Sequence, residues 1–580
     1  MPIRFNPSGT LNLGTDPADL PAETSGKMVT SGAMTRCTNL CLDRAGIAST
    51  RKGSAKLNSG SALAQTDIWR IVEQGGYRYI FAGTVIYKDE VSLAPGLTSA
   101  AWSTILGNSY NSSEQSIFAL NGTDRKRITG ATVAEWGSDS PTVAPTVAAG
   151  SLTGLTGAFN AKYTWCRKED SAVVWESNPS PAGSGAITLA NKSLKITWTA
   201  PTDSQITHVR IYRTSAGGSL YLWDQDIAIG TTTVDSDTAD TDLGTEASWV
   251  NHGRPPLGTV VLGPNFNGYA FILKDNRLYY SLPNQQEYWP DTYYIEVSSP
   301  GFPCVAGGFL DGQLFVATAV EIFSISGTGQ GTFTPLPMSA QTGTVNANCF
   351  VVVKGLGIYH LGGDGVYLYS GGTDLLMSRG SLDKIFQGET VGNVPGLNRT
   401  YINNCWMVAY HGKLYIGYPG GTSIYPDNVF VLDLQTKRFL GMSTEAQKIS
   451  HHSYASTWRA VGIDHTNKRL LAADTSGYVW KWEDVDSTDD GGTAIAWQIQ
   501  SADFNQLRKY FPRYARYDVK VGTGATAAGY ILLDETSKQT HTIIGDRLTR
   551  KRLVDGCTGD RLAVRLSGSG SVDIFGVEIE

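Results

Sequence analysis

The chain has 580 residues and a formal net charge of −6, and 17% of its residues are charged. This length can bury more than one hydrophobic core. The charge argues against a protein that grips nucleic acid along a basic face, because phosphate binding needs clustered Lys and Arg. A surface along which DNA moves without being bound is compatible with this net charge. The 65 Gly and 27 Tyr residues are typical of many short strands joined by tight turns.

Residues 1–9 contain no apolar core of a signal peptide, and no apolar run is long enough to cross a bilayer. We therefore expect a soluble protein made in a cytoplasm. The seven cysteines are an odd number, which is typical of reduced thiols. Cys37 and Cys41 are the only close pair, and a zinc site would need a second pair or a nearby His. Both are predicted to be buried or half-buried thiols, and no metal site is predicted.

Apolar residues alternate or come in short runs bounded by Gly, Asn, Asp and Pro, which predicts strands almost throughout. In chain order, residues 1–140 are interpreted as an N-terminal arm followed by the first blades of a β-propeller. Residues 77–83 are an early copy of a repeated hairpin strand. The next strand, at 85–88, carries an aromatic residue.

Residues 141–253 break this pattern and are predicted to be an inserted sandwich. They begin with a stiff Pro-rich linker at 141–146. A strand that ends in Trp198 and Pro201, followed by an alternating strand at 208–214, resembles a fibronectin type III domain. We expect Trp198 to pack between the two sheets, with Tyr212 as its neighbour on the facing strand.

Residues 254–485 are predicted to be the remaining blades, because the hairpin repeat recurs there. Each copy is a turn followed by a strand with a Leu anchor, and a second strand with an aromatic follows. The copies are 276–281, 312–317, 412–417 and 468–473. The anchors Leu278 and Leu314 are 36 residues apart, and Leu414 and Leu470 are 56 apart. This spacing suits propeller blades with loops of variable length. The alternative is a set of unrelated hairpins in a β-sandwich.

Two short helices are expected, one at 381–386 with Ser381 as the N-cap and another near 445–450. A further hairpin joins residues 357–361 to 365–369 through an Asp364-Gly365 turn. Residues 486–580 alternate again and are predicted to be a C-terminal β-sandwich. The fold class is therefore all-β, a propeller with an inserted fibronectin III-like sandwich and a C-terminal sandwich.

No catalytic residue, cofactor site or metal site is predicted. The chain lacks a nucleophile elbow with suitable partners, a His-Glu-x-x-His helix and a phosphate loop. The Gly-rich run 327–331 does not open a helix and is interpreted as a loop. His451 and His452 would point to opposite faces of a strand and could not share one metal, so we expect a surface or loop pair.

Acidic clusters at 235–237, 240–242 and 484–490 could hold Ca²⁺, but none matches an EF-hand loop, and solvated loops are the preferred interpretation. Paired carboxylates for glycoside hydrolysis stay open, because their separation is set in three dimensions. Residues 473–480 resemble a single sialidase Asp-box and are interpreted as a hairpin turn with a core Trp. The basic and aromatic stretch 508–517 could bind single-stranded nucleic acid. The preferred interpretation is a strand of the C-terminal sandwich with its Arg and Lys side chains on the solvent-exposed face. A contact with a neighbouring subunit is a third option.

The order of these parts resembles the nozzle, or tail tubular, proteins of short-tailed bacteriophages. The resemblance rests on loose motifs of turns and aromatic residues. They lie at 37–43, 46–53, 118–123, 135–137, 277–281, 287–290 and 362–367.

The resemblance implies a structural protein of the virion tail, made in the host cytoplasm and not an enzyme. It implies a homo-oligomeric ring, usually of six subunits, below the portal and adaptor. Such a ring extends and closes the DNA channel and anchors tail fibres or a needle, and DNA passes through without sequence-specific binding. Arg51 and Lys52 are candidates to face a neighbouring subunit. The alternative is a propeller-type carbohydrate-binding or glycan-cleaving tail protein, with a pocket near the propeller axis.

Overall fold

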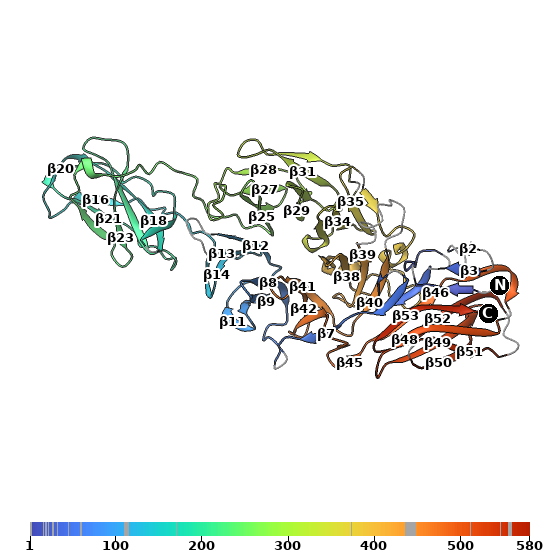
Figure 1. Cartoon of the computed structure of the whole chain (residues 1–580). Helices are drawn as coiled ribbons and strands as arrows, with labels where there is room; N and C mark the ends of the chain where they lie inside the picture. Colours follow the sequence, from blue (N-terminus) through green and yellow to red (C-terminus); the bar gives the residue numbers. More distant parts are fainter. Residues whose placement is uncertain are drawn as a thin grey trace. The chain divides into compact units, whose positions relative to one another are not determined.

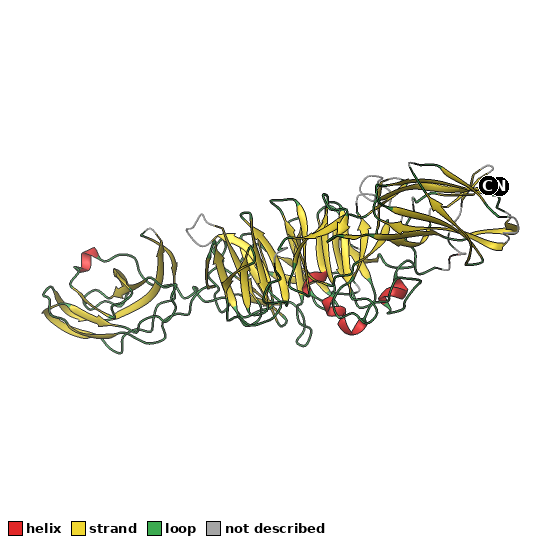
Figure 2. Ribbon diagram, turned by 90° about the horizontal axis from the view of Figure 1, so that it is seen from below, coloured by secondary structure: helices red, strands yellow, loops and turns green. Residues whose placement is uncertain are grey.

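The computed structural model describes residues 3–580, apart from 8, 16, 18–19, 21–22, 26–27, 32, 45, 59–60, 109–114, 170, 341, 373, 435–447, 511, 546 and 555–558. The protein is all-β, with many four-stranded antiparallel sheets that are consistent with a propeller-like fold. Figure 2 shows how short the helical segments are. In the described part of the chain they are α1 (Asp383–Phe386), η2 (Asp240–Asp242), η3 (Ala347–Cys349) and η4 (Arg399–Asn404). None of the described helices has the length and apolar character needed to span a membrane.

The chain divides into two compact units. Unit 1 contains residues 1–99, 319–322 and 338–580, and unit 2 contains residues 100–318 and 323–337.

Unit 1 contains two plain four-stranded antiparallel sheets. Their orders are β11-β10-β9-β8 and β33-β34-β35-β36. The strands are β8 (Ile68–Gln74), β9 (Tyr77–Ala82), β10 (Val85–Lys88), β11 (Val91–Ala94), β33 (Phe350–Val353), β34 (Gly357–Leu361), β35 (Val366–Tyr369) and β36 (Asp374–Leu376).

Two larger sheets of unit 1 begin with consecutive antiparallel strands and are extended by strands from the N-terminal arm. One has the order β37-β38-β39-β40-β4-β46-β52-β49-β50, with β47 also pairing β52, and the other has the order β41-β42-β43-β7-β44-β45. The strands of the first are β37 (Trp406–Tyr410), β38 (Lys413–Tyr418), β39 (Asn428–Asp433), β40 (Ile449–Ser453), β4 (Met34–Thr38), β46 (Ala496–Ser501), β47 (Phe504–Tyr510), β49 (Thr526–Leu533), β50 (Thr536–Ile543) and β52 (Gly559–Ser569). Those of the second are β41 (Trp458–Asp464), β42 (Arg469–Asp474), β43 (Val479–Asp484), β7 (Gly53–Lys56), β44 (Asp489–Asp490) and β45 (Thr493–Ala494).

The C-terminal module also contains strands from both ends of the chain. An eight-stranded sheet has the order β2-β3-β1-β53-β48-β51, and β5 pairs β6, which pairs β53. Its strands are β1 (Ile3–Phe5), β2 (Glu23–Ser25), β3 (Met28–Ser31), β5 (Leu40–Arg44), β6 (Ile47–Thr50), β48 (Tyr514–Val521), β51 (Thr549–Arg552) and β53 (Val572–Ile579). Figure 1 shows blue N-terminal and red C-terminal strands lying together there. One hydrophobic core extends from Ile3 and Phe5 through Ile574 to Leu414 of β38 and Phe430 of β39.

The arm therefore joins the C-terminal module to the sheet that contains β37–β40. Strand β4 lies between β40 and β46, so the sheet that starts at β37 runs on into the C-terminal module. The β4–β40 pairing is narrow, because its register is the single pair Thr38 and His451. Strand β7 supplies the fourth strand next to β43, with Lys56 opposite Trp480. Sequence patterns did not predict these strand pairings, because β4 and β7 lie more than 400 residues before their partners β40, β46 and β43.

Unit 2 contains three four-stranded antiparallel sheets and an inserted module. The four-stranded orders are β12-β13-β14-β15, β25-β26-β27-β28 and β29-β30-β31-β32. The strands are β12 (Ser103–Asn108), β13 (Gln115–Leu120), β14 (Arg125–Thr129), β15 (Thr132–Glu135), β25 (Val260–Phe266), β26 (Tyr269–Lys274), β27 (Arg277–Tyr280), β28 (Tyr294–Glu296), β29 (Ala306–Leu310), β30 (Gln313–Ala317), β31 (Ile322–Ser326) and β32 (Thr334–Pro337). Strand β31 begins at Ile322, which the division assigns to unit 1.

The inserted module has three sheets, in the orders β16-β21-β24, β17-β20 and β19-β18-β22-β23. Its strands are β16 (Thr146–Ala149), β17 (Leu155–Phe159), β18 (Ala161–Glu169), β19 (Ala172–Glu176), β20 (Ile187–Lys192), β21 (Leu194–Thr197), β22 (His208–Arg213), β23 (Leu222–Ala228) and β24 (Thr233–Ser236). As predicted, Trp198 is buried in the core of this module, with Val209 and Ile211 of β22. The expectation for Tyr212 is wrong. Successive strand residues face opposite sides, so Tyr212 lies on the other face and its hydroxyl donates to Glu176.

The repeated hairpin segments are confirmed as strands β9, β27, β30, β38 and β42, each an inner strand of its sheet. The four Leu anchors, Leu278, Leu314, Leu414 and Leu470, are buried. The anchors therefore mark positions where a central strand buries its apolar side chain, as the pattern predicted.

The expected helix at 381–386 is confirmed as α1, but its cap is not. The N-cap is Leu382, which makes no side-chain capping bond, and the Ser381 hydroxyl donates instead to the Ser378 carbonyl. The helix expected near 445–450 falls partly outside the described residues. Its last residues, Ile449 and Ser450, belong to strand β40.

Candidate functional site

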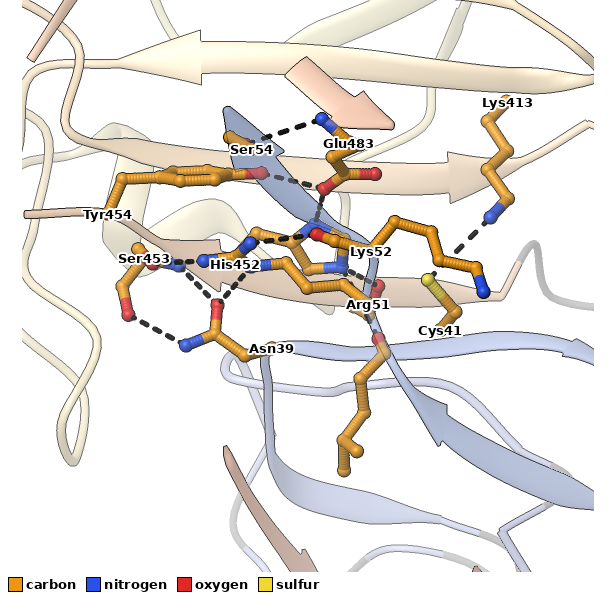
Figure 3. A network of polar contacts seen from close by, with 12 residues as sticks. Asn39, Cys41, Arg51, Lys52, Ser54, Lys413, His452, Ser453, Tyr454 and Glu483 are labelled. Atoms are coloured by element: carbon orange, nitrogen blue, oxygen red, sulfur yellow. Dashed lines mark hydrogen bonds and ion pairs between the residues drawn. The ribbon is translucent and has the colours of Figure 1, made fainter. Parts of the chain in front are cut away.

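An extensive buried polar network in the described part of unit 1 joins the N-terminal arm to β40, β43 and β44. We call it the polar clasp and define it by Asn39, Arg51, His452, Tyr454, Glu483 and Asp490. Figure 3 shows the greater part of it at close range.

Arg51 is the arm's main contribution to the polar clasp. Its side chain is 2% exposed, and its guanidinium pairs with both Asp490 oxygens, at 2.5 and 3.0 Å. Its Nε donates to Asn39 Oδ1 at 3.0 Å, and its Nη2 donates to the Ser453 carbonyl at 3.3 Å. The guanidinium carbon lies 4.2 Å from the centre of the Tyr454 ring. A buried cation needs such a full set of partners, because unpaired burial of a charge is costly.

A second pair in the polar clasp connects two different sheets. His452 of β40 contacts Glu483 of β43, with Nδ1 and Oε1 2.5 Å apart. The Tyr454 hydroxyl donates to the same Glu483 oxygen at 2.6 Å. Burial alone would lower the pKa of His452, but the Glu483 carboxylate outweighs burial and raises this pKa to about 9.

The charges around Glu483 shift its own pKa in the opposite direction. Burial alone would raise the pKa of Glu483, but the charge and hydrogen bond of His452, together with Arg51, lower it to about 2. For Arg51, burial would lower the pKa, and contacts with Tyr454, Asp490 and Glu483 reverse this and raise it. At neutral pH the pair is therefore an imidazolium and a carboxylate. Such a pair fastens strands together.

Cys41 lies at the edge of this network. Its sulfur is 3.6 Å from Nζ of Lys413, which lies on β38 (Figure 3). His452 also interacts with the Cys41 side chain. The predicted burial of Cys37 and Cys41 is confirmed, at 0% and 9% exposure. What the sequence could not indicate is that a cation from another strand approaches the sulfur of Cys41.

The histidine pair behaves only partly as expected. His451 and His452 do face opposite sides of β40, since His451 contacts Asn428 at 2.9 Å whereas His452 contacts Glu483. The expected surface or loop position is wrong, because both are buried in the strand. Burial, helped by the charge of His452, lowers the pKa of His451 to about 3.

The acidic clusters supply structural ion pairs as well as solvated loops. Asp490 pairs with Arg51, and Asp240 pairs with the fully buried Arg213 at 2.7 Å. No group of three or more His, Cys, Asp or Glu among the described residues is arranged to hold a metal ion. The expectation of solvated loops therefore misses the role of Asp240 and Asp490.

The position of Arg51 contradicts the expectation for this residue. It was a candidate to face a neighbouring subunit, but its side chain is enclosed by its own chain. Lys52 is exposed, and its role stays a prediction.

The Asp-box-like segment is confirmed as a hairpin turn with a core Trp. Asp474 Oδ1 accepts hydrogen bonds from the Ser476 and Tyr478 amides, and Oδ2 accepts from the Trp480 indole at 2.8 Å. Trp480 is 7% exposed. The Gly-rich run 327–331 lies between β31 and β32.

The basic and aromatic stretch 508–517 falls on β47 and β48. The side chains of residues 505–511 lie outside the described part, so their role stays a prediction. Farther along, Arg516 is 42% exposed in its side chain and lies near Glu578.

A second group in unit 1 presents half-buried aromatic rings. The Arg459 guanidinium lies over the rings of Trp69 and Tyr425, 4.3 and 4.6 Å from their centres. It also pairs with the exposed Asp67 at 2.8 Å. Aromatic faces beside an arginine and a carboxylate are groups that sugars bind, although here Arg459 already covers part of both rings.

In unit 2 a buried pair joins the inserted module to the segment between β27 and β28. Arg167 of β18 contacts Glu287 at 2.7 and 3.3 Å, and Glu287 is 0% exposed. Close to it, Glu176 accepts hydrogen bonds from Thr164 and Tyr212. The role of this pair is the same as that of the polar clasp, since it joins segments far apart in the sequence.

Comparison with known proteins adds little to this description. No protein-family model matches the chain, and no curated protein matches it. One similar solved structure is the extracellular domain of a B. thetaiotaomicron protein described as a one component system. It is 7% identical, the match covers 90% of this chain and 76% of that one, and the TM-score is 0.23. Another is a glycoside hydrolase with 10% identity, coverage of 90% and 99%, and a TM-score of 0.18. Likeness at these TM-scores has no bearing on function.

Proposed function

We propose that this chain is a structural protein of a virus particle, the nozzle or tail tube of a short-tailed bacteriophage. In this proposal it forms a homo-oligomeric ring of six below the portal and adaptor. The ring extends and closes the DNA channel, anchors tail fibres or a needle, and lets DNA pass without reading its sequence. The chain performs no catalysis and needs no cofactor.

The proposal includes a finer assignment of the fold. Residues 1–140 supply the arm and first propeller blades, 141–253 a fibronectin III-like insertion, 254–485 the remaining blades and 486–580 a C-terminal β-sandwich. The sequence resemblance to tail nozzle proteins carries the functional part of the proposal.

The structural observation that most supports a mechanical role is that buried charged side chains pair with each other across different strands. Arg51 with Asp490, His452 with Glu483 and Arg167 with Glu287 each pair side chains from distant segments. Removing one partner of such a buried pair is strongly destabilising, so each pair makes separation of the joined segments costly. That property suits a protein that must keep its form while a particle is assembled and DNA is ejected.

The experiment is to purify the full chain and determine its mass by mass photometry over a range of concentrations, followed by cryo-electron microscopy. We expect closed rings of six copies, with a central opening wide enough for a DNA duplex. A chain that stays monomeric at every concentration and cleaves a glycan would overturn the proposal.

Carbohydrate binding is a second candidate function, and the Trp69, Tyr425 and Arg459 group is the observation in its favour. Glycan-array binding by the wild type and by Trp69→Ala separates the two candidates. Loss of a wild-type signal in Trp69→Ala would support carbohydrate binding. No wild-type signal on any glycan would contradict it.

A further inference from the structure

Strand β51 is the terminal strand of the eight-stranded sheet in the C-terminal module. Among the described residues it pairs with β48, from Tyr514 opposite Arg552 to Tyr517 opposite Thr549, and with no other strand. Strand β2 is the terminal strand at the opposite edge of the same sheet (Figure 1). A terminal strand presents a row of backbone N–H and C=O groups to which a further strand can bond.

The register of β51 shows which of its backbone groups point to the open edge. The Leu553 amide donates to the Arg513 carbonyl at 2.8 Å, and these two residues continue the register of the β48–β51 pair. In an antiparallel pair, every second residue of a strand bonds to a given neighbour. Thr549 and Lys551 therefore bond toward β48, and the N–H and C=O groups of Arg550 point away from it.

Large apolar side chains flank this open edge on both sides. Ile544 and Leu548 come shortly before β51 and are 78% and 62% exposed, and Val554 comes just after it and is 64% exposed. Single exposed apolar residues are ordinary on a protein surface, but a group of them marks an interaction site. Here the exposed apolar side chains coincide with an unpaired strand edge.

The turn that exposes Leu548 is held in an unusual conformation. Leu548 has a φ of 55° and Arg547 a φ of 82°, which residues with side chains seldom adopt. The Arg547 guanidinium bonds both oxygens of Asp518, at 2.9 and 3.0 Å, and its central carbon lies 4.0 Å from the centre of the Phe575 ring. Backbone strain of this kind persists where the surrounding structure fixes it. The contacts of Arg547 therefore keep Leu548 facing outward.

The charges of the two edges indicate which strand can pair with β51. Strand β51 has three consecutive basic residues, at 550–552, so a pair of two β51 strands would place like charges opposite each other. Strand β2 begins with Glu23 and contains no basic residue. A β51–β2 pair avoids the repulsion of a β51–β51 pair and brings a carboxylate to the basic edge.

We propose that β51 of one copy of this chain pairs with β2 of the next copy, so that the eight-stranded sheet continues from subunit to subunit. The inference rests on the ring in the proposed function and names its interface. Addition of a strand to an open edge is a common mode of recognition. A contact between two different edges is head-to-tail, and in a closed ring it leaves neither edge open. The same contact would cover Ile544, Leu548 and Val554.

Two substitutions of Arg550 test the backbone contact. Arg550→Pro removes the outward N–H and leaves the bonds to β48, because proline is tolerated on an edge strand. Arg550→Ala keeps that N–H and removes the side chain, including its pair with Glu580 at 2.8 Å. By mass photometry of the full chain, we expect Arg550→Pro to raise the concentration at which half of the rings dissociate about tenfold relative to Arg550→Ala. Circular dichroism verifies that both variants are folded.

The outcomes separate this inference from the proposed function. Rings that are equally stable in Arg550→Pro and Arg550→Ala would overturn the β51–β2 interface and leave the ring itself intact. A wild type that is monomeric at every concentration would overturn both.

The apolar part of the interface has its own matched pair of variants. Leu548→Asp places a charge in the proposed contact, whereas Val485→Asp places one between β43 and β44, at a position that is 74% exposed. We expect Leu548→Asp to convert rings into monomers and Val485→Asp to leave them unchanged. An equal effect of the two substitutions on the rings would contradict the proposal.

Cross-linking of the wild type tests the contact without any substitution. Rings are assembled from a mixture of unlabelled and ¹⁵N-labelled copies and treated with a carbodiimide, which joins a lysine directly to a carboxylate. Because β2 and β51 are short, their pairing brings Lys551 of one copy close to Glu23 of another. Mass spectrometry is expected to find this link between labelled and unlabelled peptides. Rings in which Lys551 links only to carboxylates of its own copy would rule out the pairing.

Discussion

At the scale of single residues, several buried charges of this chain are compensated by partners from other strands. His452 and Glu483 are 31 positions apart in the sequence, and Arg51 and Asp490 are 439 apart. Only 17% of the residues are charged, and several of them are buried in such pairs. We infer that these pairs help to specify the fold. Their hydrogen bonds fix which strand edges meet, because a mispaired register would leave a charge buried without a partner.

The His452–Glu483 pair predicts a particular dependence of stability on pH. The pKa of His452 in the folded protein, about 9, is above its ordinary value of 6.5. Its contribution to stability is therefore complete below about pH 6.5 and is lost as pH rises through 9. We expect the free energy of unfolding, measured with urea, to fall over this interval in the wild type, and His452→Gln to remove that slope.

His451→Gln is the control for this experiment, because the low pKa of His451, about 3, keeps it neutral throughout the interval. It should leave the slope intact. At pH 6.5 we expect His452→Gln to cost about 3 kcal/mol, since it leaves Glu483 buried without its cation. A slope that persists in His452→Gln would mean that other groups cause it.

At the scale of elements, the arm strands β4 and β7 complete sheets that begin hundreds of residues later. The two strands differ in how they are held. Strand β4 is tied to β40 at a single residue pair, and the polar clasp lies beside that junction. Strand β7 is held by close backbone packing, because β44 lies directly against Gly53.

Gly53→Ala tests this close approach. A Cβ at Gly53 would lie 2.0 Å from the Asp489 carbonyl oxygen, so β44 would have to move and carry Asp490 away from Arg51. We expect a loss of about 2–3 kcal/mol in the free energy of unfolding, as for an overpacked core position. Gly372→Ala is the matched control, because a Cβ there meets nothing within 4 Å. The interpretation would be wrong if the two variants were equally stable.

At the scale of the whole molecule, buried ion pairs also decide which modules unfold together. Within unit 2, Arg167 and Glu287 join the inserted module to the four-stranded sheets, beside a small apolar cluster of Trp175, Ile206 and Tyr288. Without that tie each side keeps its own core, since Trp198 lies in one and Trp289 in another. The pair therefore couples two cores that could melt separately.

Arg167→Met is predicted to uncouple them. It leaves Glu287 buried and short of its closest cation, and we expect a separate low-temperature transition of the inserted module in scanning calorimetry. Lys168→Met is the control, because Lys168 pairs with Asp226 inside the module at 2.8 Å. Identical calorimetric traces for the two variants would refute this view of the coupling.

The sequence by itself determined the local structure. Alternating apolar residues and Leu anchors such as Leu278 and Leu414 predicted the central strands, and Trp198 predicted the core of the inserted module, because strand periodicity and turn chemistry act over a few residues. It also predicted that His451 and His452 face opposite sides. It could not predict their burial, since burial depends on which sheets cover a strand.

Only the tertiary structure decided that the arm strands β4 and β7 pair with strands from much later in the chain, and that the polar clasp forms. Nothing near Arg51 in the sequence indicates Asp490, and nothing near Cys41 indicates Lys413, because pairing between distant segments leaves no periodic trace in either one. Charge compensation in a low-dielectric interior selects those partners, and it acts only once the chain has brought them together.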